Sequence, residues 1–179
     1  DDVSYIILMA GTGVTGIDII KEQSKLIMKA ENATENEITG YTMVMDLIYA
    51  NIVKNGDMKE LKEQLAQNVE DSFDKMSAEE KKAIKNKDEY IEKTVDETIS
   101  QFSSKWMKYF LSYDPAKALE KVTIPVLMLF GGKDLQVPVS QNRPPMEDAL
   151  KKAGNQEYLV KVFPDANHLF QEAGTGSPN

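Results

Sequence analysis

The sequence predicts an α/β fold in which a parallel sheet is interrupted by a long helical segment. Three short apolar runs, each bounded by glycine, proline or polar turn residues, are typical of buried strands. The residues between the first two runs contain helical signals and no convincing strand. The expected strands are residues 5–10, 125–130 and 158–163.

A helix is expected between the second and third strands, over residues 144–153. Pro144 suits the first turn of a helix, and Gly154 with Asn155 suits its end. A strand, a helix and a strand at this spacing form a βαβ unit with parallel strands and a right-handed crossover. The sequence therefore predicts a partial parallel sheet of about three strands.

The segment from residue 17 to residue 113 is predicted to be helical. Apolar residues recur every four positions on one face, as in the series from Leu61 to Phe73. Three patterns of the capping-box type mark helix starts. They are residues 34–37, 57–60 and 77–80.

Composition and charge exclude several classes of site. The formal net charge of −8 argues against nucleic acid or an anionic membrane as the main partner. The chain has no cysteine and one histidine, which excludes disulfides, thiolate metal sites and multi-histidine metal sites. No apolar run reaches the length of a membrane span. Neither a metal nor a cofactor is expected, and the composition leaves the compartment open.

Gly11, Gly13 and Gly16 form a G-x-G-x-x-G pattern after the first expected strand. This pattern suggests a dinucleotide site only if a second strand ending in an acid follows about 20 residues on. Residues 41–46 end in an acid, but Asp46 lies 30 residues beyond Gly16 and the pattern continues as a helix. We prefer a glycine turn leading into a helix, and a titration with a nicotinamide cofactor would distinguish the two interpretations.

Two polar residues follow the second and third expected strands. Asp134 comes after a glycine turn, and His168 follows 34 residues later. Each alone is ambiguous, but both are expected at the carboxyl edge of the sheet, where open α/β sheets bind ligands. A carboxylate there can accept one imidazole N–H, which leaves the other nitrogen free to take a proton from a serine.

The sequence around these residues resembles the C-terminal part of the α/β-hydrolases, and most closely the bacterial carboxylesterases and serine-aminopeptidase-like hydrolases. The similar segments are residues 119–127 (LEKVTIPVL), 131–138 (GGKDLQVP) and 167–171 (NHLFQ). The resemblance implies that Asp134 is the catalytic acid and His168 the catalytic base. It further implies a core formed by residues 1–16 and 114–179, with residues 17–113 inserted as a helical cap.

One element of that family is missing from the sequence. The nucleophilic serine of the family lies in a G-x-S-x-G motif before the acid, and no such motif occurs here. The nearest string, residues 174–178, follows the histidine. The first apolar run begins almost at once after Asp1. We therefore expect that residues before Asp1 belong to the full protein, that they supply the serine, and that this chain alone is inactive.

The leading hypothesis is a serine hydrolase that acts on a small acyl ester or a peptide-like substrate. The alternative is a non-enzymatic interaction module in which the helices of residues 17–113 bind a partner. A G-x-S-x-G motif upstream would favour the enzyme. Because the first strand would have an exposed edge, we also expect association with a second copy or with the missing N-terminal half.

Overall fold

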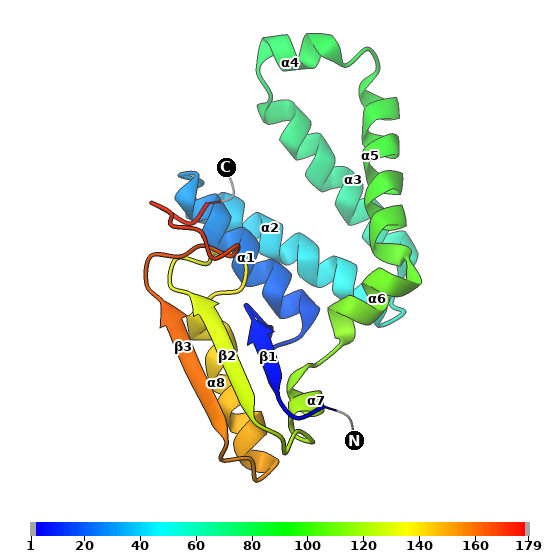
Figure 1. Ribbon diagram of the computed structural model, residues 1–179. Helices are drawn as coiled ribbons and strands as arrows, with labels where there is room; N and C mark the ends of the chain where they lie inside the picture. The colour runs from blue at the N-terminus through cyan, green and yellow to red at the C-terminus, as the bar shows by residue number, and fades with distance from the viewer. Residues whose placement is uncertain (1–2, 178–179) are drawn as a thin grey trace. The chain divides into compact units, whose positions relative to one another are not determined.

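The sheet contains three parallel strands in the order β1-β2-β3 (Figure 1). The computed structural model describes residues 3–177. Each strand lies within one residue of its predicted limits, which confirms the α/β fold class and the partial parallel sheet. The strands are β1 (Ile6–Met9), β2 (Val126–Gly131) and β3 (Tyr158–Phe163).

Helix α8 (Val139–Lys152) joins β2 to β3 and completes the predicted βαβ unit. It begins at Val139, before the predicted start at Pro144, so that Pro144 and Pro145 lie inside the helix. The backbone N–H and the side-chain amide of Asn142 both donate to the carbonyl of Pro138, which closes the first turn ahead of the prolines. A proline inside a helix removes one backbone donor and crowds the carbonyl four residues earlier, at a cost of about 3 kcal/mol or more. Burial of Met146, Ala149 and Leu150 of the same helix opposes that cost.

The hydrophobic core lies between β2 and α8. Alternate residues of β2 are buried on this face, and Met128 and Phe130 have no exposed surface. They pack with Met146 and Leu150 of α8, and with Leu119 of the short helix α7 (Ala116–Leu119). Full burial of such a side chain contributes about 1.5–3 kcal/mol. This core fixes the two strands whose carboxyl ends precede Asp134 and His168.

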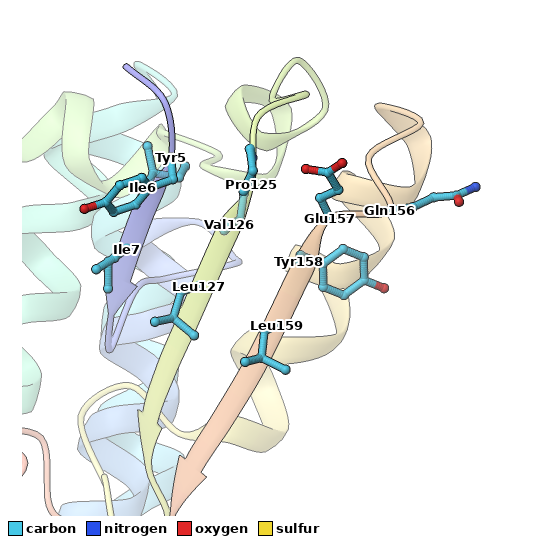
Figure 2. Close-up of a pocket in the computed structure, with 10 residues that line it drawn as sticks. All are labelled: Tyr5, Ile6, Ile7, Pro125, Val126, Leu127, Gln156, Glu157, Tyr158 and Leu159. Atoms are coloured by element: carbon cyan, nitrogen blue, oxygen red, sulfur yellow. The ribbon is translucent and has the colours of Figure 1, made fainter. Parts of the chain in front are cut away.

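The other face of the sheet presents a row of apolar side chains. Ile7, Leu127 and Leu159 are aligned by the strand register and lie side by side in Figure 2. Ile7 is 49% exposed and Leu159 is 64% exposed. A groove of about 480 Å³ lies here, lined at the amino-terminal ends of the strands by residues such as Tyr5 and Glu157. It therefore lies toward the opposite end of the sheet from Asp134 and His168.

Residues 17–113 are helical as predicted, and no strand occurs among them. Residues 41–46, which a dinucleotide site would need as a strand, lie within a helix. The elements are α1 (Gly16–Ala30), α2 (Glu35–Ile48), the π-helical turn η1 (Tyr49–Val53), α3 (Met58–Lys75), α4 (Ala78–Ala83), α5 (Lys87–Ser103) and α6 (Lys105–Ser112).

Two of the three predicted capping boxes form both of their hydrogen bonds, those that begin at Thr34 and at Ser77. The third is half formed. Asp57 accepts from the backbone N–H of Glu60, but the carboxylate of Glu60 accepts from the side chain of Gln64. The side-chain amide of Gln64, four residues further along α3, thus takes the place of the backbone N–H of Asp57 as the donor to Glu60.

The described chain forms two compact units. The sheet-bearing unit comprises the residues up to Thr42 and from Ser112 onward. It includes α1, and the side chain of Gln141 in α8 donates to the carbonyl of Asp18 in α1 at 2.9 Å.

The second unit is Met43–Leu111. In it α3 and α5 lie side by side and are joined through α4 (Figure 1). Leu61 and Leu65 of α3 and Val95 of α5 are buried in this unit. The assignment of residues 17–113 to a cap stays a prediction.

Candidate active site

Asp134 lies in the segment that joins β2 to α8. We call residues 131–137, which begin with the last residue of β2, the acid turn. The side chain of Asp134 has no exposed surface. One carboxylate oxygen, Oδ1, accepts hydrogen bonds from the backbone N–H groups of Gln136 and Val137 at 2.8 and 2.9 Å. A buried carboxylate needs such partners, and these two fix its orientation. The second oxygen, Oδ2, is thereby held toward His168.

His168 lies in the loop after β3, residues 164–173, which we call the histidine loop. The neck of the loop is closed by a hydrogen bond of 3.0 Å from the N–H of Ala173 to the carbonyl of Asp165. Inside the loop, the side-chain oxygen of Asn167 accepts from the N–H of Leu169 at 3.0 Å. The loop is therefore held by its own hydrogen bonds on both sides of the imidazole.

The structure brings the two predicted site residues together. Nδ1 of His168 lies 2.9 Å from Oδ2 of Asp134. Because an ionised carboxylate only accepts hydrogen bonds, this contact places the proton of a neutral imidazole on Nδ1. The side chain of His168 is 31% exposed, and Nε2 has no hydrogen bond to any described residue. The arrangement leaves a base, Nε2, open to a substrate or a nucleophile, although the catalytic roles stay predictions.

The two glycines of the acid turn allow it to approach the histidine loop closely. A Cβ atom at Gly131 would lie 2.5 Å from the carbonyl oxygens of Ala166 and Asn167. One at Gly132 would lie 2.6 Å from the carbonyl oxygen of Pro164. Real Cβ atoms essentially never come so near to backbone atoms. The Gly-Gly pair before the acid is thus explained by packing against the segment that contains the histidine.

Lys133 also contributes to this region, and the sequence did not predict its contacts. Its ammonium group donates to the carbonyl of Ala173 at 2.7 Å and lies 3.2 Å from the carboxylate of Asp165. Both partners are at the neck of the histidine loop. A lysine next to an acid in a turn gives no sequence signal for such contacts, because its partners are 32 and 40 positions away in the chain.

The glycine motif after β1 also has a structural explanation. A Cβ atom at Gly13 would lie 2.2 Å from the backbone oxygen of Asn142 and 2.7 Å from the side chain of Met146. The backbone N–H of Gly13 donates to the side-chain oxygen of Asn142 at 2.9 Å. This N–H is therefore engaged with α8, which favours the packing interpretation over a phosphate site.

The described residues, 3–177, contain no group of three or more His, Cys, Asp or Glu side chains placed to hold a metal ion. None of their helices has the length and apolar character needed to cross a membrane.

Comparisons with known proteins match this chain to hydrolases. The family model described as the prolyl oligopeptidase family, Peptidase_S9, matches residues 75–178, which is more than half of the chain. Esterase EstD of Thermotoga maritima is 31% identical over 106 residues. That match covers 59% of this chain but only 23% of the length of EstD. No solved structure matches the chain.

Proposed function

Since the chain belongs to the prolyl oligopeptidase family, we propose that it forms part of a serine hydrolase in which His168 is the general base and Asp134 orients it. The observation that supports this most directly is the 2.9 Å contact between Nδ1 of His168 and the buried carboxylate of Asp134. The proposed nucleophile is a serine outside these 179 residues, because the sequence contains no G-x-S-x-G motif.

In the proposed reaction, Nε2 of His168 takes the proton of the serine hydroxyl while the serine oxygen attacks the acyl carbon. The bond to the leaving group then breaks, and the imidazolium returns its proton to that group. Water hydrolyses the acyl-enzyme by the same proton transfers. Asp134 keeps the imidazole in the correct tautomer and stabilises its charged form throughout.

We propose carboxylic esters as the substrate class, on the basis of the similarity to a protein named an esterase. The family description favours a second candidate, a peptide bond. Both are acyl transfers to serine and need the same acid–base pair. Rates of the longer protein on p-nitrophenyl esters and on peptide p-nitroanilides would decide between them.

The activity test uses the protein extended at its N-terminus to include the serine. His168→Ala is expected to lower kcat by about 10⁶-fold and Asp134→Asn by about 10⁴-fold, as removal of the corresponding triad member does elsewhere. The matched control is Asp148→Asn, the same change at an exposed carboxylate of α8. The 179-residue chain alone is expected to be inactive on these esters. Full activity of either site variant would reject the proposal.

A second test needs no activity. His168 is the single histidine, so its imidazole signals can be assigned without ambiguity by long-range ¹H–¹⁵N NMR. We expect the neutral ring to carry its proton on Nδ1. In Asp134→Asn the side-chain oxygen can still accept from the N–H groups of Gln136 and Val137, and the NH₂ group then faces Nδ1 of His168. Because an NH₂ group donates, Nδ1 must accept, and the ring proton should move to Nε2. An unchanged tautomer in Asp134→Asn would show that this contact does not orient the ring.

A further inference from the structure

We infer that Lys133 is a positioning residue that holds the histidine loop on the acid turn, so that Nδ1 of His168 stays within hydrogen-bonding distance of Asp134. The inference rests on the proposed function. The ammonium group of Lys133 donates to the carbonyl of Ala173 at 2.7 Å and pairs with the carboxylate of Asp165 at 3.2 Å.

The two contacts of Lys133 lie at the neck of the histidine loop. Asp165 and Ala173 form the neck of the histidine loop, where the N–H of Ala173 donates to the carbonyl of Asp165 at 3.0 Å. One ammonium group therefore binds both ends of the loop that contains His168. The backbone N–H of Lys133 adds a third contact, because it donates to the carbonyl of Ala166 at 3.0 Å.

Lys133 is adjacent to Asp134 in the chain, so the loop is fixed to the same turn that orients the carboxylate. The carboxylate itself is immobilised by the N–H groups of Gln136 and Val137. Motion of the histidine loop is therefore the main way in which the pair could separate. The side chain of Lys133 is 33% exposed, so its contacts are partly shielded from water.

An exposed ion pair contributes little to stability. The pair between Lys133 and Asp165 is therefore expected to contribute little, because the side chain of Asp165 is 70% exposed. The hydrogen bond to the carbonyl of Ala173 is charge-assisted and thus stronger than a neutral one. The expected effect of Lys133 is accordingly on the geometry of the Asp134–His168 contact, with little change in overall stability.

The test compares Lys133→Met, which keeps the length of the side chain without its charge, with Lys133→Arg, which restores a cationic donor. Lys151→Met is the control, since Lys151 is an exposed lysine of α8 that pairs with Asp148. The readout is the exchange rate with water of the Nδ1 proton of His168, measured by NMR in the 179-residue chain. Circular dichroism checks the fold of each variant.

Lys133→Met is expected to speed this exchange by about fivefold or more, the ratio that corresponds to the loss of about 1 kcal/mol for the hydrogen bond to Ala173. Lys133→Arg should recover most of the protection, and Lys151→Met should match the original chain. Wild-type exchange in a folded Lys133→Met variant would overturn the inference. If that variant does not fold, Asp165→Asn replaces it, and unchanged exchange there would also overturn the inference.

This outcome is separate from that of the proposed function. The exchange rate reports the contact between His168 and Asp134 whether or not the protein hydrolyses an ester. Activity that survives His168→Ala in the extended protein would reject the hydrolase mechanism and leave the positional effect of Lys133 intact. In an active protein, Lys133→Met should lower kcat with little change in KM, and Lys133→Arg should restore it.

Discussion

Gly176 packs against the acid turn in a conformation that other residues rarely adopt. Its φ angle is +77°, and a Cβ atom there would lie 1.7 Å from the carbonyl oxygen of Lys133. Two separate costs therefore apply to a side chain at this position, backbone strain and a steric clash. Gly154 has a similar φ angle of +72° but has nothing within 4 Å of a Cβ atom, so it shows the strain alone.

We predict that Gly176→Ala destabilises the fold more than Gly154→Ala does. The strain of a positive φ angle costs about 1–2 kcal/mol for alanine. At Gly176 the clash adds to it, and relief of the clash requires the residues around Gly176 to move away from Lys133. Urea denaturation of both variants measures the two free energies of unfolding. Equal losses would mean that the close approach to Lys133 contributes nothing.

At the scale of the single element, α4 (Ala78–Ala83) depends on its capping box. It has no buried residue, so packing contributes little to it. Two hydrogen bonds with Ser77 hold the pKa of Glu80 below its usual value. The bond with the side chain of Ser77 has the larger effect, and the bond with its backbone the smaller. The backbone N–H of Ser77 donates to the carboxylate of Glu80 at 2.8 Å.

We predict that α4 loses helicity in acid and in Ser77→Ala. Because the pKa of Glu80 is lower in the folded state, the cap stabilises the helix fully above the unfolded pKa of about 4.5. The stabilisation decreases as the pH falls through the lower folded value. Ser77→Ala should cost about 1 kcal/mol of local helix stability. Amide hydrogen exchange in residues 78–83 measures both effects, and equal protection in Ser77→Ala would contradict the prediction.

The elements that the sequence predicted well are those whose cause is local. The strands were recognisable as apolar runs, and the capping boxes at Thr34 and Ser77 were recognisable because their partners are three residues apart. The resemblance to the α/β-hydrolases is confirmed by the family match. The predicted start of α8 is wrong, because the sequence places Pro144 in the first turn whereas the helix begins at Val139 and contains Pro144 in its interior.

The parts of the site that could not be predicted depend on contacts between distant residues. The adjacency of Asp134 and His168 was expected from the rule that parallel strands end at one edge. Nothing local indicated that Lys133 would reach Asp165, or that Gly131 must be small because of Ala166. Such contacts arise only when the two loops are packed together in three dimensions.

At the scale of the whole molecule, the sheet of the described residues has a partly exposed apolar face and has β1 at one edge. In the described residues β1 pairs with β2 alone, and the N–H groups of Ile6 and Ala10 point to β2. Since N–H groups alternate in direction along a strand, those of Ile7 and Met9 point away from it. Parallel sheets are normally covered on both faces, and edge strands are templates for pairing with another chain.

We therefore predict that the 179-residue chain, when alone, associates with a second copy through β1 and the apolar row beside it. Light scattering across a dilution series should show a mass that rises with concentration. Leu159→Lys combined with Ile7→Lys should shift the chain toward monomer, because each places a charge in the apolar row. Met43→Lys is the matched control, since Met43 is 63% exposed and Leu159 is 64% exposed. A chain that stays monomeric at every concentration would contradict the prediction.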